Sequence, residues 1–341
     1  MASHEPRIQP LIECRNLSKH YPITSGVFGR ETGRVRAVDN LSIHVGKGET
    51  YSLVGESGCG KSTTGRLFLL LERPTAGQIV MDDADITRLK GPALKRFRRR
   101  VQVVFQDPFS SLNPRMTVGA IVQEGMTIQN PAMSSAEKRE KAAHLLALTG
   151  LDGEALDRYP HEFSGGQRQR VGLARALATD PDFIVADEAV SALDVSIQAQ
   201  IINLLRDLQE RLGLAYLFIA HDLAVVRHLS HRVGVMYLGN LVEEASAADL
   251  FDEPLHPYTR ALLSAIPEPD PRADRKRIIL AGDVPRADRP PPGCRFHTRC
   301  PQAMPRCREG EIPEYAPSPG RRVKCLLYEG AHIVREKAGA I

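Results

Sequence analysis

The sequence lacks long hydrophobic runs, and residues 67–71 form one of its longest apolar stretches. A helix that spans a bilayer needs about 20 apolar residues, so no such helix is predicted. Residues 1–13 are polar and contain proline, without the apolar core of a signal peptide. We therefore expect a cytosolic protein that meets a membrane only through a partner.

A large excess of charge is also absent. The chain has 45 Lys and Arg against 41 Asp and Glu in 341 residues, which gives a net charge of +4. Binding to nucleic acid usually requires a clearly basic face, so this balance predicts no nucleic-acid partner. The basic run at residues 95–100 is predicted to be a solvated helix face.

Two glycine-rich segments of different kinds each precede a helix-forming run. Residues 55–62 read Gly-Glu-Ser-Gly-Cys-Gly-Lys-Ser and fit the pattern G-x-x-x-x-G-K-[ST] at every fixed position. Residues 163–167 read Phe-Ser-Gly-Gly-Gln. A glycine-rich turn that opens a helix presents free N–H groups and the positive end of the helix dipole to an anion. The second segment has no lysine, so we interpret it as half of a phosphate site whose nucleotide is held elsewhere.

The first segment carries the residues that we expect to hold a nucleoside triphosphate. Lys61 should reach the β- and γ-phosphates, backbone N–H groups of residues 58–62 should surround them, and the Ser62 hydroxyl should bind Mg²⁺. The residues assigned to nucleotide binding in this stretch are Gly55, Glu56, Ser57, Gly58, Cys59, Gly60, Lys61, Ser62 and Thr63. The alternative is that residues 55–62 match the phosphate-loop pattern by chance. The acidic pair described next argues against a chance match.

Polar residues directly follow predicted apolar strands. Asp187 and Glu188 come after the run at residues 183–186, and Gln106 and His221 each follow another such run. Ligands of open α/β sheets collect at the carboxyl ends of the strands. We therefore expect Asp187 to hold Mg²⁺ and Glu188 to orient and polarise an attacking water. Gln106 or His221, taken alone, would more often be a hydrogen-bonded structural residue than a functional group.

The composition divides the chain into a core and a C-terminal extension. Short apolar runs separated by turns fill residues 8–54, helical periodicity dominates residues 107–165, and continuous apolar runs in residues 183–220 are typical of buried parallel strands. Within the helical part, Ser-Ser-Ala-Glu at 134–137 is predicted to be a capping box at a helix start. Fourteen of the 24 prolines and four of the six cysteines lie at or beyond Pro254. We predict a core at residues 8–250, with a helical insert at about 107–165. A loop-rich extension at residues 251–330 and a tail at 331–341 follow.

The four late cysteines are Cys294, Cys300, Cys307 and Cys325, separated by five, six and seventeen residues. Zinc sites favour closer pairs of cysteines, so this spacing alone names no metal. In a cytosolic protein, cysteines indicate metal binding, redox chemistry or no special role, rather than disulfides.

The combination of both glycine-rich segments with the acidic pair resembles the ATPase subunits of ATP-binding-cassette (ABC) transporters. Within that family the sequence is similar to oligopeptide and dipeptide importer ATPases, on the stretches Glu-Pro-Leu-His-Pro-Tyr-Thr at 253–259 and Pro-Pro-Gly-Cys-Arg-Phe-His-Thr-Arg-Cys-Pro at 291–301. Residues 111–117 and 164–170 further resemble the second of that family's two paired ATPases. The resemblance runs from Leu11 to about Tyr328. The usual proline after the catalytic glutamate is replaced here by Ala189, which removes no reacting group.

The resemblance implies a fold and a set of roles. The fold is α/β: a P-loop NTPase core with an antiparallel β subdomain and a helical insert, plus the small Pro- and Cys-rich C-terminal extension. Tyr21 would stack on adenine, and Gln106 and His221 would approach the γ-phosphate, with Gln106 also contributing to the Mg²⁺ site together with Ser62 and Asp187. The second glycine-rich segment would complete the partner's nucleotide site through Ser164, Gly165, Gly166 and Gln167. Residues 191–194 match the family's dimer-contact loop, from which Asp194 would reach the same site. Glu188, His221 and Gln106 would be the catalytic residues.

The resemblance also implies cofactors and partners. ATP and Mg²⁺ are expected, and in relatives the cysteine quartet can hold a [4Fe–4S] cluster, with zinc or unligated thiols as alternatives. The partners would be a second ABC ATPase, identical or homologous, and two transmembrane permease subunits, with an extracytoplasmic substrate-binding protein acting indirectly. The chain would then lie on the cytoplasmic side of the inner membrane.

Three functions are compatible with this resemblance. The first is ATP hydrolysis that drives uptake of dipeptides or oligopeptides. The second is the same ATPase type serving nickel or glutathione import. A soluble ABC ATPase acting on DNA or ribosomes is the third, but the long heptad arms or tandem cassettes of such proteins are not visible here.

Overall fold

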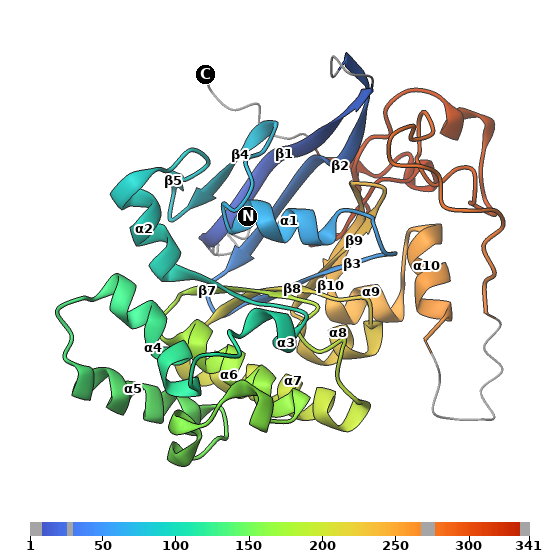
Figure 1. The fold of residues 1–341 in the computed structure, drawn as a ribbon. Coiled ribbons are helices and arrows are strands. Elements are labelled where there is room, and N and C mark those ends of the chain that lie inside the picture. The colour runs from blue at the N-terminus through green and yellow to red at the C-terminus, as the bar shows by residue number, and fades with distance from the viewer. Residues whose placement is uncertain (1–8, 26–29, 267–276, 335–341) are drawn as a thin grey trace, which may run out of the picture.

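The structure, a computed structural model, describes residues 9–25, 30–266 and 277–334. Its centre is a mixed sheet of nine strands in the order β13-β11-β12-β10-β9-β3-β8-β7-β6 (Figure 1). The strands β6, β7, β8, β3 and β9 are parallel to one another, and β10 runs antiparallel to β9. Their bounds are β3 Thr50–Val54, β6 Val101–Val104, β7 Phe183–Asp187, β8 Ala215–Ile219, β9 Arg232–Tyr237, β10 Asn240–Ser246, β11 Tyr315–Ala316, β12 Arg322–Val323 and β13 His332–Ile333.

A second, antiparallel sheet of four strands has the order β2-β1-β4-β5. Its members are β1 Pro10–Ser25, β2 Arg30–Gly46, β4 Ala76–Met81 and β5 Ala84–Asp85. The turns within residues 8–54 predicted several short strands, whereas β1 and β2 are long. The register of their pairing shifts at several points, including between Cys14 and Leu17. Such irregularities let one strand pass through turn-like residues without ending.

Ten α-helices surround the two sheets in the described part of the chain. They are α1 Lys61–Phe68, α2 Gly91–Arg100, α3 Pro108–Ser111, α4 Val118–Gln129, α5 Ser135–Leu148, α6 Gly165–Leu177, α7 Val195–Leu212, α8 Leu223–Leu229, α9 Ala247–Asp252 and α10 Pro257–Ser264. Short 3₁₀ turns occur at Gly153–Asp157, Pro160–Glu162, Pro305–Arg308 and Leu326–Tyr328. The predicted capping box that opens α5 is confirmed, because Ser134 and Glu137 bond to each other's backbone N–H groups. No described helix combines the length and the hydrophobicity that a bilayer crossing demands.

Apolar side chains cover both faces of the nine-stranded sheet. Along β7, Ile184 and Ala186 face one core, which α4 to α8 share, while Phe183 and Val185 face the other, which contains α1 and the antiparallel sheet (Figure 1). A strand buried on both faces must be apolar at every position. This is why residues 183–186 read as an uninterrupted hydrophobic run.

The C-terminal extension is part of the same sheet. Its strand β12 pairs antiparallel with β10, through Glu243 with Val323 and Glu244 with Arg322. The composition predicted a loop-rich segment with little core of its own, and its small apolar cluster contains Tyr315, Val323 and Cys325 together with Leu255. The extension is therefore stabilised mainly by attachment to the rest of the chain.

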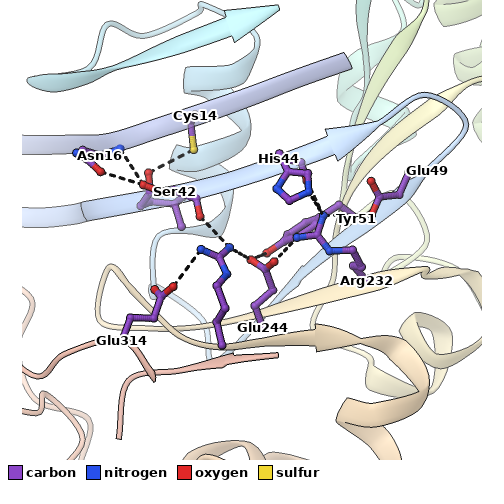
Figure 2. Close-up of polar contacts among 11 residues, drawn as sticks. Cys14, Asn16, Ser42, His44, Glu49, Tyr51, Arg232, Glu244 and Glu314 are labelled. Atoms are coloured by element: carbon purple, nitrogen blue, oxygen red, sulfur yellow. Dashed lines mark hydrogen bonds and ion pairs between the residues drawn. The ribbon is translucent and has the colours of Figure 1, made fainter. Parts of the chain in front are cut away.

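A buried charge network fixes this attachment (Figure 2). The Glu244 carboxylate, 2% exposed, accepts hydrogen bonds from Arg232 on β9, from Arg322 on β12 and, at 3.0 Å, from the Tyr51 hydroxyl on β3. Arg322 also donates to the Ser42 carbonyl oxygen of β2 at 3.2 Å and to Glu314 at 3.1 Å. One carboxylate thus links the extension to the central sheet, and Arg322 links it to the antiparallel sheet.

Candidate active site

The first glycine-rich segment forms the loop between β3 and α1. Gly60 is the N-cap of α1 with φ +109°, and a Cβ added there would lie 2.0 Å from the Ala37 carbonyl oxygen. Both the backbone conformation and the close approach therefore require glycine at this position. The helix predicted after this motif is confirmed, and β3 leads directly into the loop.

The lysine of this loop is buried and bonds to the loop itself. Lys61 Nζ donates to the carbonyl oxygens of Gly55 at 2.7 Å and Glu56 at 3.1 Å. Cys59 lies inside the loop, and burial raises the pKa of its thiol, so this cysteine is a neutral packing residue. Ser57 and Gly58 are exposed at the tip of the loop. The loop can therefore present N–H groups and one ammonium to an anion that arrives from solvent.

Substitution of Gly60 by Ala should abolish tight ATP binding, because the new methyl group would displace the loop from Ala37. We expect the dissociation constant for MgATP to rise by about tenfold or more, as 1–3 kcal/mol of backbone strain is moved into the site. Titration with a fluorescent ATP analogue would measure this. Gly172→Ala in α6 is the matched control, because its Cβ meets no atom within 4 Å. Equal affinity of the two variants would contradict the prediction.

The predicted acidic pair lies next to this loop. Asp187 is the last residue of β7, and Ser62 Oγ at the start of α1 donates to its Oδ1 at 3.0 Å. Burial raises the pKa of the Asp187 carboxyl, and the Glu188 carboxylate adds to the rise. Oxygen ligands of this kind suit Mg²⁺. Ser62 and Asp187 are thus direct neighbours, and their binding of Mg²⁺ together with Gln106 stays a prediction.

Glu188, Gln106 and His221 converge from the ends of three strands. Glu188 Oε2 accepts a hydrogen bond from Gln106 Nε2 at 2.7 Å and lies 3.6 Å from His221 Nδ1. Gln106 and His221 are exposed, and Glu188 is partly buried. Because β6, β7 and β8 are adjacent and parallel, their carboxyl ends bring these side chains to one edge of the sheet.

The backbone of Glu188 is held in an uncommon conformation. Its φ is +47°, a value that non-glycine residues rarely adopt outside functional sites. The Glu188 N–H donates to the Ile219 carbonyl oxygen at 2.9 Å, and the Glu188 carbonyl oxygen accepts from both N–H and Oγ of Ser191. These bonds fix the direction of the carboxylate, which no sequence pattern revealed.

Tyr21 lies on β1 and is partly buried. Its hydroxyl donates to Glu72, and Lys19 Nζ is 4.9 Å from the centre of its ring. Burial and the Glu72 carboxylate raise the pKa of the Tyr21 hydroxyl, while Thr63 of the loop opposes the rise through a hydrogen bond. The aromatic ring is therefore placed beside the end of the loop. Its stacking on adenine stays a prediction.

The second glycine-rich segment opens α6, as predicted. Ser164 is the N-cap and exchanges hydrogen bonds with Gln167 in a capping box. A Cβ at Gly166 would lie 2.5 Å from Ile197 of α7, whose N-cap Asp194 accepts from Ile197 N–H. The segment and Asp194 thus form one packed surface. Contact of Ser164, Gly165 and Gly166 with a partner's nucleotide stays a prediction.

The four C-terminal cysteines line one small pocket together with His256 and Phe296. Burial raises the pKa of the Cys294 thiol to about 12, with a further contribution from the other three cysteines, and burial raises that of Cys325 to about 11. Yet no three His, Cys, Asp or Glu side chains in the described residues are arranged to hold a metal ion. The thiols share a pocket, as a cluster would require, but their arrangement does not support the expected [4Fe–4S] cluster or zinc.

Comparison with known proteins identifies the family. Residues 38–191 match the family described as ABC transporter, and residues 242–307 match the oligopeptide/dipeptide transporter C-terminal region. The chain is 52% identical over 324 residues to the oligopeptide transport ATP-binding protein AppF of Bacillus subtilis, which covers 94% of this chain and 98% of AppF. It belongs to the ABC transporter family. A putative peptide import ATP-binding protein of Brucella ovis is 55% identical over 298 residues, which covers 87% of this chain and 92% of that protein.

Solved structures place the ABC ATPase fold on most of the chain. The dimeric ATP-binding cassette MJ0796, in a post-hydrolysis state bound to ADP and Pi, matches with a TM-score of 0.62 and 30% identity, over 69% of this chain and 98% of that one. CbiO1 of Clostridium perfringens, described as part of the ABC transporter complex cbiONQ, matches with a TM-score of 0.63 and 26% identity, over 72% and 91%. The fold class predicted from the ABC resemblance is confirmed, and the chain is an ABC-type ATPase.

Proposed function

We propose that this ABC ATPase drives the uptake of dipeptides or oligopeptides through a permease. The match of residues 242–307 to the oligopeptide/dipeptide transporter C-terminal region carries this proposal. The peptide-transport names of relatives that cover most of the chain support it. The ABC ATPase acting on nucleic acid has no such support. Import of nickel or glutathione is the second candidate. It has weaker support, because only the family resemblance suggests that such importers share this type of ATPase.

In the proposed mechanism the phosphate loop binds the β- and γ-phosphates of ATP. Lys61 would exchange its bonds to the Gly55 and Glu56 carbonyl oxygens for phosphate oxygens. Ser62 and Asp187 would hold Mg²⁺, with Gln106 contributing. Mg²⁺ supplies neutralisation of the phosphate charge. The Glu188 carboxylate would orient a water toward the γ-phosphorus, with Gln106 and His221 on either side of it. Phosphoryl transfer depends mainly on such positioning and charge neutralisation.

The proposed site is completed by a second cassette. Lys61 and Glu188 stand on one protomer, whereas the partner's Ser164–Gly166 segment would cap the γ-phosphate with the free N–H groups of its helix start. Two permease subunits in the inner membrane would contact the cassettes on their cytoplasmic side. A substrate-binding protein would deliver the cargo. The four C-terminal cysteines take no part in this mechanism.

Uptake by cells that lack this chain tests the proposal. Deletion of this ATPase should lower the uptake of labelled di- and oligopeptides by about tenfold or more, because the permease completes its transport cycle only when ATP is hydrolysed. Uptake of nickel ions and of glutathione should stay unchanged. Complementation with the intact chain should restore peptide uptake, and complementation with Glu188→Gln should not. Loss of nickel or glutathione uptake with peptide uptake intact would favour the second candidate.

A further inference from the structure

Two residues from the C-terminal part of the chain hold the phosphate loop at Glu56. The Tyr258 hydroxyl of α10 accepts a hydrogen bond from the Glu56 backbone N–H at 2.8 Å. Arg299, which lies between Cys294 and Cys307 in the extension, donates from Nη1 to Glu56 Oε2 at 2.8 Å. One loop residue is therefore bound through its backbone and its side chain by segments more than 200 positions away in the sequence.

Glu56 in turn shapes the rest of the loop. Its carbonyl oxygen accepts from Lys61 Nζ at 3.1 Å and from the Cys59 N–H at 3.3 Å. A cavity of about 190 Å³ lies along the loop, lined by residues 56–59, by Tyr237 and Leu238, and by Val284, Pro285 and Ala287. Because of this cavity, side-chain packing does not support the loop on the side that faces residues 284–287. The two bonds to Glu56 therefore fix its position.

Both anchors are themselves rigid. Tyr258 is fully buried, and its ring centre lies 4.7 Å from that of Tyr237 and 5.3 Å from that of Phe296. The Arg299 side chain is 9% exposed. Burial disfavours its charge, but the bonds to Glu56 and Tyr237 outweigh this effect and raise the pKa of the guanidinium, so Arg299 stays charged. These contacts leave the anchors little freedom to follow a moving loop.

Burial of Arg299 is also unfavourable for the stability of the fold. Its Nε is buried with no hydrogen-bond partner among the residues that the structure describes. An unpartnered buried donor costs free energy. The positive charge of Arg299 lies beside the Glu56 carboxylate in the loop proposed to bind phosphates. Without a nearby cation, that carboxylate would repel the phosphates. Arg299 removes that repulsion.

We propose that Arg299 and Tyr258 are positioning residues of the ATP site, which hold the phosphate loop in its binding shape and neutralise Glu56. This inference rests on the proposed binding of ATP phosphates by residues 55–62. The extension is then a working part of the ATPase site, and not only a subfamily appendage.

Arg299→Gln in the complete chain tests the proposal. We expect the KM for MgATP, and the dissociation constant of a fluorescent ATP analogue, to rise about tenfold, the effect of losing one hydrogen bond between charged groups. The turnover number should change less than about threefold, because the residues around Glu188 are untouched. Tyr258→Phe should raise KM by a smaller factor, since it removes a single neutral bond.

Three comparison variants separate positioning from general destabilisation. Arg299→Lys should recover part of the affinity. The double variant Glu56→Gln/Arg299→Gln should bind ATP better than Arg299→Gln alone, because the unpaired carboxylate is gone. Arg306→Gln removes an exposed pair with Glu329 in the same extension and should leave KM unchanged.

An Arg299→Gln protein that melts near the wild-type temperature and binds ATP with wild-type affinity would overturn the inference. A double variant no better than the single one would overturn the role assigned to charge neutralisation. If the wild-type chain itself bound no ATP, the proposed function would fail instead. These outcomes are distinguishable in one titration series.

Discussion

Replacing Glu188 with glutamine should nearly stop ATP turnover while ATP binding persists. The amide has the size of the carboxylate but can neither accept a proton nor carry the charge that polarises water. Positioned general bases contribute about 10²–10⁴-fold to rate, and we expect the turnover number to fall within that range. The dissociation constant for MgATP should change little, because Lys61 and the loop are untouched. Phosphate release under saturating ATP measures the first effect, and analogue binding measures the second.

Glu210→Gln is the matched control for this experiment. Glu210 lies on α7, is 69% exposed at its side chain and pairs with Arg206 at 3.7 Å. The same chemical change there should leave turnover at the wild-type level. A Glu188→Gln protein that hydrolysed ATP as fast as this control would show that another group activates the water. Gln106 and His221, both next to Glu188, would then be the groups to replace.

Glu244→Gln should cause the largest loss of stability. The substitution removes the charge that holds Arg232 and Arg322 and leaves two partly buried guanidinium groups facing a neutral amide. Breaking a buried ion pair on one side costs about 3–5 kcal/mol, and we expect a decrease of this size in the free energy of unfolding at pH 7. Urea titration followed by circular dichroism measures it. Glu314→Gln is the control, because Glu314 also pairs with Arg322 but is 16% exposed.

The pH dependence of stability should report the same network. Burial alone would raise the pKa of Glu244, but Arg322 and Arg232 outweigh it and hold this pKa below its ordinary value of 4.5. The stabilisation is therefore complete above the unfolded-state pKa and is lost as the pH falls through the lower folded-state pKa. Wild type should lose stability more steeply than Glu244→Gln below about pH 4.5. Parallel acid curves for the two proteins would contradict the assignment.

The sequence was most informative where a local pattern has one geometric outcome. The phosphate loop, the capping box at Ser134 and the apolar strand that ends at Asp187 were all predicted at or near their observed positions. The conformation of each of these features depends on residues only a few positions apart in the sequence. A local sequence pattern is therefore enough to predict it. The convergence of Gln106, Glu188 and His221 also followed, because parallel strands end at one edge.

Long-range partners could not be read from the sequence. Arg299 and Tyr258 are 243 and 202 residues from Glu56, and only the path of the folded chain makes them neighbours. In the sequence, Tyr258 stands out only as part of the stretch at 253–259 that resembles the subfamily. The composition of the extension alone predicts a poorly packed appendage, because β10, the strand with which it pairs, lies outside it. The cysteine spacing alone predicted no metal, and the arrangement of the thiols does not support the cluster that the family resemblance implied.

The position of β12 has a consequence for biosynthesis. Translation proceeds from the N-terminus, so the ribosome finishes β10 some 80 residues before it makes the strand that covers its edge. During that interval Glu244 has only Arg232 as a cationic partner, and an open strand edge is exposed to other nascent chains. The newborn polypeptide can pair β10 with β12 only after residue 323 has been made. A premature stop codon ahead of β12 would thus leave the edge of the central sheet open and damage more than the residues it removes.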